Sequence, residues 1–314
     1  MWLQHNPQSF LTGDAPFIRA STLEADRSRV DHEFVFEDRH EGFIGIPHGG
    51  LAMGLCLDAW RRVASSAYPV DARFKFGGTG VSIGDSVVFS VENKDQREGP
   101  CLCATITKNG DKAPYIKAEI TPAAGSLPPD TKGPATSVFR ELPYYRNCFV
   151  CGHHRSVPGL QRRFRVHLDD DDSRVVSSVW GAASEDRERA DLFLIGKDEL
   201  HPAVLTSIFD ENTAWAGFMQ TRTCGLSVRV TFTLLRPVAL SEQLLFVGRP
   251  AGTRGNPRSP RFFLGEGTIF SISDRVAPEP VAFGRGEWLV VDRYNEQIKT
   301  NLLPDNDWEW IFTE

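Results

Sequence analysis

A Pro-His-Gly-Gly turn at residues 47–50 leads directly into an apolar segment of helical length. Gly49 and Gly50 allow the backbone to turn sharply. Their N–H groups would stand at the start of a helix, where the first donors have no partner within the helix and the dipole is positive. Such a helix start can hold an oxygen that carries negative charge. We therefore expect this turn to be a site for an oxygen with partial negative charge, with His48 beside it.

A second segment of the same shape begins at His201 and continues as Pro202-Ala203-Val204, 153 residues after His48 (201 − 48). Its apolar run contains two adjacent acids, Asp210 and Glu211. A carboxylate can serve as a general base or as a nucleophile. Because the offset is close to half of the 314 residues, the sequence indicates an internal duplication, and we look for function where the two copies differ.

The elements that must position these residues can be predicted from periodicity. Apolar residues between 51 and 63 recur with the helical period, which predicts a helix. Nearly all of its first residues are apolar, which predicts that this helix is buried. A run of strands follows each helix, and Asn109-Gly110 marks a hairpin turn. This order predicts the α+β class. The strands are expected over residues 29–36, 74–76, 86–91, 101–106 and 115–120, and then over 160–166, 175–180, 228–234, 243–247, 262–272 and 287–291.

A Pro/Gly-rich stretch at residues 122–138 is the predicted linker between the two copies. The predicted domains are therefore residues 1–138 and residues 139–314. The second domain includes a C-terminal tail, residues 294–314, whose aromatic side chains we expect to dock on the body of the protein.

These features resemble the hotdog-fold thioesterase superfamily, and most of all its phenylacetyl-CoA thioesterase group. The resemblance covers most of both halves. It is carried by His48-Gly49-Gly50, by Phe209-Asp210-Glu211, by Thr231-Phe232-Thr233-Leu234-Leu235-Arg236-Pro237-Val238, and by Asn147-Cys148-Phe149-Val150-Cys151-Gly152 with Gly159-Leu160 downstream. The fold that this resemblance implies is an antiparallel sheet wrapped around a long helix, with two such domains paired. One chain would supply both, as two tandem hotdog domains.

The resemblance also implies a site between the paired domains. In the family, the N–H of the first glycine polarises a thioester carbonyl, and a carboxylate nine residues after the partner's histidine acts as base or nucleophile. Gly49 and Asp210 occupy these positions here. The converse pair is Pro202, which has no N–H, and Leu57, which has no acid. Asp58 follows Leu57 but points about 100° away on a helix. A single complete centre is therefore predicted.

Further residues are expected around this centre. We expect His48 to fix the turn, Ser227 to help hold the attacking water, and Glu211 to be a second acid in the substrate site. Thr213 would support Asp210, and Gly50 would contact the substrate beside Gly49. Whether Asp210 activates water or attacks the carbonyl itself stays open.

Two other signals have competing interpretations. Arg254 and Arg258 lie in a Gly/Pro-rich loop that could hold the phosphates of CoA, or could simply be a solvated hairpin tip. Cys148 and Cys151 have the spacing of zinc ligands, but no second Cys pair follows at a suitable distance. We therefore interpret the Cys pair as a turn typical of the family, and we expect no metal and no cofactor.

Composition narrows the class of protein. A formal charge of −6 argues against nucleic-acid binding, and no apolar run approaches the ~20 residues of a membrane span. Six cysteines in a chain of this length do not suggest a disulfide framework. The N-terminal residues lack the basic start and apolar core of a signal peptide, so a cytoplasmic location is expected.

The sequence thus predicts hydrolysis of a thioester of CoA or of an acyl carrier, with acyl-CoA as the small-molecule partner. The alternative is a non-catalytic acyl-CoA-binding or scaffold protein that uses the same pocket. A hotdog dehydratase ranks lower, because the Asp-x-Asn-Pro-x-His pattern is missing from the sequence. The paired domains also allow a homodimer of such chains.

Overall fold

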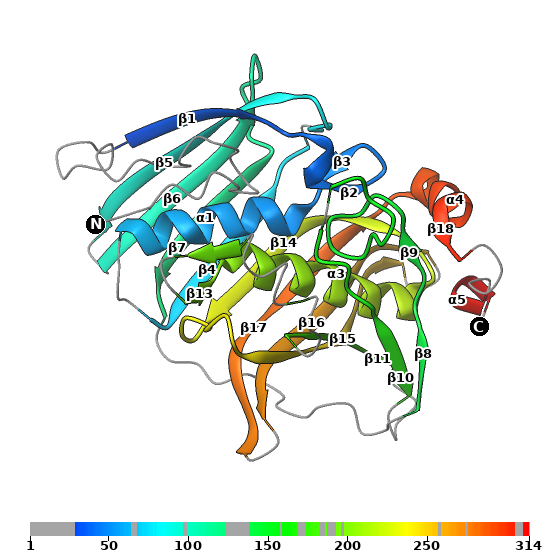
Figure 1. Ribbon diagram of the computed structural model, residues 1–314. Coiled ribbons are helices and arrows are strands. Elements are labelled where there is room, and N and C mark those ends of the chain that lie inside the picture. Colours follow the sequence, from blue (N-terminus) through cyan, green and yellow to red (C-terminus); the bar gives the residue numbers. More distant parts are fainter. Residues whose placement is uncertain are drawn as a thin grey trace.

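The computed structural model describes residues 29–63, 68–78, 80–96, 99–123, 138–157, 159–168, 174–181, 186, 193–195, 198–256, 259–273, 276–304 and 310–313. Within these ranges one large antiparallel sheet curves around two central helices, α1 (Gly49–Val63) and α3 (Pro202–Thr221), which lie side by side (Figure 1). This confirms the predicted α+β class. Residues 124–137 of the predicted linker lie outside the described ranges. No helix in the described part combines the length and apolarity needed to cross a bilayer.

The described part of the large sheet has the strand order β1-β5-β6-β7-β4-β14-β17-β16-β15-β11-β10-β8. Its strands are β1 (Arg29–Val35), β4 (Val70–Phe76), β5 (Ser86–Gln96), β6 (Gly99–Lys108), β7 (Ile116–Pro122), β8 (Phe139–Glu141), β10 (Arg165–Leu168), β11 (Arg174–Trp180), β14 (Gly225–Leu234), β15 (Gln243–Asn256), β16 (Ser259–Ser273) and β17 (Val276–Val290). Short pairs are formed by β2 (Glu41–Phe43) with β3 (Ile46–Pro47), by β12 (Leu194–Ile195) with β13 (Glu199–Leu200), and by β9 (Tyr144–Tyr145) with β18 (Leu302–Leu303).

The two halves of the chain repeat one order of elements. In the first half β1 and α1 precede β4, β5, β6 and β7, and in the second half β11 and α3 precede β14, β15, β16 and β17. The sheet order is mirrored about the pair β4·β14, with β7, β6, β5 and β1 on one side and β17, β16, β15 and β11 on the other. This mirror order agrees with the duplication predicted from the 153-residue offset.

Alternation along the strands decides which side chains face the helices. In β4 the residues Val70, Ala72 and Phe74 are buried, and the residues between them are more exposed. This strand pairs with β14 from Val70↔Leu234 to Lys75↔Arg229, so the central seam of the sheet joins the two halves of the chain. One predicted strand was placed too early. β10 begins at Arg165, and Leu160 instead donates its N–H to the Phe149 carbonyl at 2.8 Å.

Small residues let α1 and α3 approach closely. A β-carbon on Gly50 would overlap the Ser207 backbone, and one on Gly54 would overlap Ala203. The Thr206 hydroxyl donates to the Gly50 carbonyl at 2.7 Å. Because position numbers rise along one helix as they fall along the other in these contacts, the helices are antiparallel. The start of α1 therefore lies against the middle of α3.

The C-terminal segment packs on the body, as predicted, in the part that is described. It forms α4 (Asp292–Asn301), the strand β18 and α5 (Trp310–Thr313), which Figure 1 shows together at one end of the molecule. The Phe312 ring packs edge-on to Phe218 of α3 at 5.4 Å between ring centres. Arg222 donates to the Ile311 carbonyl at 3.0 Å.

Candidate active site

His48 caps the start of α1. Its Nδ1 atom accepts a hydrogen bond from the Gly50 N–H at 3.1 Å. In the second half, His201 Nδ1 accepts from the Ala203 N–H at 3.0 Å in the same way. In a neutral ring whose Nδ1 is an acceptor, the proton is on Nε2. This geometry agrees with the expectation that His48 fixes the turn, and it leaves the ring Nε2–H pointing toward a partner.

The cap leaves one donor of the turn unused. The Gly49 N–H has no backbone acceptor among the described residues, since it is the first residue of α1 and makes no turn or loop bond. Gly49 lines a large cavity. A donor at the positive end of a helix, open to a cavity, suits an oxygen that gains negative charge during a reaction.

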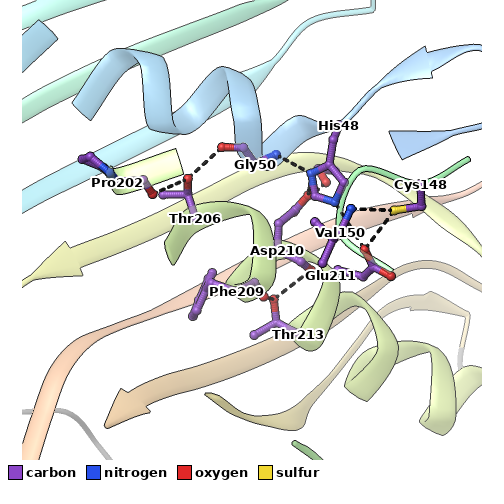
Figure 2. Close-up of polar contacts among 11 residues, drawn as sticks. His48, Gly50, Cys148, Val150, Pro202, Thr206, Phe209, Asp210, Glu211 and Thr213 are labelled. Carbon is purple, nitrogen blue, oxygen red and sulfur yellow. Dashed lines mark hydrogen bonds and ion pairs between the residues drawn. The ribbon is translucent and has the colours of Figure 1, made fainter. Parts of the chain in front are cut away.

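Asp210 of α3 lies against this turn (Figure 2). Its Oδ2 atom is 4.0 Å from His48 Nδ1, and a β-carbon built on Gly49 would lie 3.2 Å from that oxygen. Its Oδ1 atom accepts a hydrogen bond from the Ser227 hydroxyl at 3.0 Å. Ser227 precedes a register shift between β14 and β17, in which Val228 is the extra residue. The structure thus brings Gly49, His48, Asp210 and Ser227 together, as predicted.

The surroundings of Asp210 tune its acidity. Burial raises the pKa of this carboxyl above its ordinary value, while the Ser227 hydrogen bond opposes that rise. The pKa is therefore shifted upward, in the direction that makes a carboxylate a better general base near neutral pH.

Glu211, the next residue of α3, is held from two sides. Its Oε2 atom lies 3.4 Å from His48 Nε2 and 3.2 Å from the Cys148 thiol, which donates to it (Figure 2). Glu211 also lines the cavity. The contact with His48 fits the Nε2–H donor that the cap leaves, so Glu211 holds the ring that closes the turn.

The equivalent positions at the start of α3 and in α1, Pro202 and Leu57, differ from Gly49 and Asp210. Leu57 is buried, and Pro202 opens α3 without an N–H. Asp58 Oδ2 lies 3.9 Å from His201 Nε2 and therefore corresponds to Glu211 rather than to Asp210. The structure thus retains the histidine cap and the acid that faces it in both halves, whereas the glycine donor and the aspartate at the ninth position occur together only at Gly49 and Asp210.

The cavity beside Gly49 has a volume of about 1020 Å³. Its walls come from the loops at residues 42–49 and 76–83, from α3, from the start of β14 and from α4. Most lining side chains are apolar or aromatic, and among the described lining residues Arg293 of α4 is the one Arg or Lys. A cavity of this size and character suits an acyl group with a long or bulky arm.

Of the other predicted residues, Gly50 and Arg254 are not among those that line the cavity. Gly50 packs on Ser207 and gives its N–H to His48, so it does not line the cavity. The buried Thr213 hydroxyl donates to the Phe209 carbonyl at 2.7 Å and to the Asp210 carbonyl at 3.2 Å, so it contacts the backbone of Asp210 and does not line the cavity. Arg254 pairs with Glu287 at 2.6 Å and also lies away from the lining residues. Spacing along the chain could not show where these groups point. Arg258 lies outside the described residues.

Other residues of the site were not found from the sequence. Cys148 and Cys151 line the cavity beside Glu211, although the sequence suggested only a turn. The side chains of Tyr294 and Ile298 form part of its wall from α4. The repeat of apolar residues at positions 294, 298 and 302 was the signal that could have placed this face of α4 against the body.

No protein-family model matches the sequence, and no curated protein does. Solved structures share the fold. An acyl-CoA thioesterase II from Mycobacterium marinum is similar at 15% identity with a TM-score of 0.51, covering 86% of this chain and 95% of the other. An N-terminal dehydratase from the difficidin assembly line has 13% identity and a TM-score of 0.56, covering 87% and 97%. The dehydratase domain of PpsC from Mycobacterium tuberculosis, in complex with C12:1-CoA, has 13% identity and a TM-score of 0.52, covering 85% and 96%.

Another solved structure, from Alicyclobacillus acidocaldarius, is a conserved protein described by its hotdog fold. It has 13% identity and a TM-score of 0.51, and it covers 88% of this chain and 97% of that one. These similarities confirm the predicted hotdog fold over most of the chain. At such identities they concern the fold alone, and both thioesterases and dehydratases share it.

Proposed function

We propose that this hotdog-fold chain is an acyl-CoA thioesterase with one composite centre, in which α1 supplies the oxyanion donor and α3 supplies the acid. We further propose that residues 1–138 and 139–314 are two tandem hotdog domains, consistent with the mirrored strand order. The observation that carries the proposal is the approach of Asp210 Oδ2 to Gly49, at 3.2 Å from the β-carbon position, beside an unused N–H.

In this mechanism the thioester carbonyl accepts a hydrogen bond from the Gly49 N–H. Negative charge develops on that oxygen as the carbonyl carbon is attacked, and the α1 dipole and the N–H stabilise it. Asp210 either takes a proton from the attacking water or attacks the carbon itself. In the first case Ser227, hydrogen-bonded to Asp210, lies where it can orient the water. In this first case the proton taken by Asp210 passes to the leaving thiolate of CoA, and the free acid departs. In the second case the thiolate leaves as Asp210 forms a mixed anhydride with the acyl group, and water then hydrolyses that anhydride, which releases the acid, restores the carboxylate and supplies the proton for the thiolate.

The cavity supports acyl-CoA as the substrate. Its aromatic and aliphatic walls fit the acyl arm, and Arg293 supplies positive charge for a phosphate. The Mycobacterium tuberculosis dehydratase domain of the same fold was solved with C12:1-CoA, which suggests that the fold can take such a ligand. An acyl carrier protein, whose prosthetic arm ends in the same thiol, is the other source of the thioester.

The test is acyl-CoA hydrolysis over a panel of chain lengths. Asp210→Asn should lower kcat by roughly 10²–10⁴ if it removes a general base, and Gly49→Pro by about 10²–10³ if it removes one oxyanion donor. Pro202→Gly is the matched control, because it makes the reverse change at the equivalent turn and should leave turnover unchanged.

The melting temperature of each variant is the control for correct folding. Because the pKa of Asp210 is raised in the folded chain, ionising this group costs stability as pH rises through that pKa. The neutral Asn variant should therefore melt no lower than the wild type near neutral pH. Full turnover in both variants would reject the site. Binding of acyl-CoA without any turnover in the wild type would select the non-catalytic binding protein instead.

Arg293 gives a separate prediction for binding. Because this side chain is exposed at the cavity, Arg293→Ala should raise KM by roughly fivefold, about 1 kcal/mol, with kcat little changed. The effect should shrink as salt is added. Lys299→Ala, on the same helix but outside the cavity lining, is the control. An equal KM in the two variants would contradict a role for Arg293 in holding the phosphate.

A further inference from the structure

Four side chains with metal-binding atoms gather at one wall of the cavity: His48, Cys148, Cys151 and Glu211. His48, Cys148 and Glu211 each offer one such atom, and these three atoms lie within 4.8 Å of one another. The Cys151 thiol lies next to Cys148 and Glu211 but outside this group of three, so it completes a four-ligand set only when its side chain moves toward His48. The sequence suggested no second ligand pair for the two cysteines, because His48 and Glu211 come from distant parts of the chain.

We propose that these four side chains form a binding site for a thiophilic divalent cation, with Zn²⁺ as the fitting ion. Cysteine, histidine and carboxylate are the ligands of tetrahedral zinc sites. The usual Zn–N and Zn–O bonds place those two ligand atoms about 3.4 Å apart, and Zn–S with Zn–O gives about 3.6 Å. The corresponding distances here are 3.4 Å for His48–Glu211 and 3.2 Å for Cys148–Glu211.

The turn that carries the cysteines points backbone N–H groups at one of the two sulfurs. The Val150 N–H donates to Cys148 Sγ at 3.3 Å, and the Cys151 N–H also points at this sulfur. Burial raises the pKa of the Cys148 thiol, and these N–H groups oppose that rise. The Gly152 N–H donates to the Cys148 carbonyl at 2.9 Å, and a β-carbon on Gly152 would overlap that oxygen. This tight turn therefore requires a glycine at position 152, directly after the second cysteine.

When a cation is bound at Nε2 of His48, the other ring nitrogen, Nδ1, needs a hydrogen-bond acceptor. When Nε2 binds a cation, the proton of the ring must be on Nδ1, and metal-bound histidines commonly donate that proton to a carboxylate. Asp210 Oδ2 lies 4.0 Å from Nδ1. The Gly50 N–H, released by this change, already lies within reach of Asp210. Binding of the ion would displace the two thiol protons to solvent and leave Glu211 as the carboxylate ligand.

Cobalt(II) is the probe, because it takes zinc's place in tetrahedral sites and reports on its ligands. The reduced full-length chain should bind one Co²⁺, with a thiolate-to-cobalt charge-transfer band and the intense visible bands of a tetrahedral ion, and Zn²⁺ should bleach both. In Cys148→Ser and in Cys151→Ser the charge-transfer band should fall by about half, and the affinity should fall at least about tenfold.

Cys224→Ser is the matched control, since Cys224 is also buried and lines the same cavity, and its spectrum should equal that of the wild type. Melting temperatures without metal show whether each variant folds. A wild-type chain that gives no charge-transfer band, or a band that Cys148→Ser and Cys151→Ser leave intact, overturns the inference. The readout does not involve thioester hydrolysis, so it can fail or succeed independently of the proposed function.

Discussion

At the scale of single residues, the site depends on which hydrogen bonds the Gly49–Gly50 turn leaves unused. The cap by His48 consumes the Gly50 N–H, so the neighbouring Gly49 N–H stays available to a ligand. In the second half the same cap is present, but Pro202 removes the donor at the position of Gly49. The cap is thus a property of both helix starts, whereas the free donor belongs to one of them.

Ser227 gives a prediction about pH. Its hydroxyl donates to Asp210 and lowers the pKa of that carboxyl, against the rise caused by burial. A base must be ionised to act, so kcat/KM should rise with pH through the Asp210 pKa. In Ser227→Ala the pKa of Asp210 rises further, and the acidic limb of the pH profile should move to higher pH.

The measurement is a pH profile of kcat/KM for acyl-CoA hydrolysis. Ser227→Thr keeps the hydroxyl and should return the limb toward its wild-type position. A limb that stays in place in Ser227→Ala would mean that Asp210 is not the group that titrates.

At the scale of elements, the contact between α1 and α3 sets the distance between the donor and the acid. Gly50 and Gly54 of α1 meet Ser207 and Ala203 of α3 without room for a β-carbon. These pairs lie two turns or less from the Gly49–Asp210 approach. Separating the helices would therefore pull apart the two groups that we propose as catalytic.

Gly54→Ala tests this coupling. The added methyl would overlap the Ala203 backbone, and overpacking of this kind costs about 1–3 kcal/mol, more than the ~1 kcal/mol that alanine adds to helix propensity. The melting temperature and kcat should both fall. Gly80→Ala is the control for stability, because its β-carbon meets no atom of the described residues within 4 Å. An unchanged melting temperature in Gly54→Ala would show that the helices can separate at no cost.

The elements show what sequence reasoning could reach. Apolar periodicity placed α1 and α3 correctly, and the turn residues placed their starts. The family resemblance, which puts the acid nine residues after the histidine, then led to Asp210. Sequence reasoning could not reveal that Glu211 contacts both Cys148 and His48, because these contacts join three distant segments of the chain. Nor could it tell that Thr213 turns into its own helix and Arg254 toward Glu287, since direction depends on packing.

At the scale of the whole molecule, the mirrored strand order relates the two helix starts to each other. Each start has a histidine whose Nε2 faces an acid of the other helix, at 3.4 Å in His48–Glu211 and 3.9 Å in His201–Asp58. The second pair lies in a buried group with Arg61, whose Nε is 3.5 Å from Asp58. The symmetric contacts therefore support both helix turns, whereas the proposed chemistry uses Gly49 and Asp210, which have no counterpart at Pro202 and Leu57.

The helices that meet at the centre belong to one polypeptide, with Thr206 of α3 bonded to Gly50 of α1. Intragenic complementation should therefore fail: co-expressed Gly49→Pro and Asp210→Asn chains should remain as inactive as either chain alone. An enzyme assembled from two separate copies would instead form hybrids with one intact pair and recover activity. Recovery here would mean that the helices exchange between chains. Without exchange, a variant chain cannot lower the activity of a wild-type chain expressed beside it. The activity of each folded molecule then depends only on the Gly49 and Asp210 positions of its own chain.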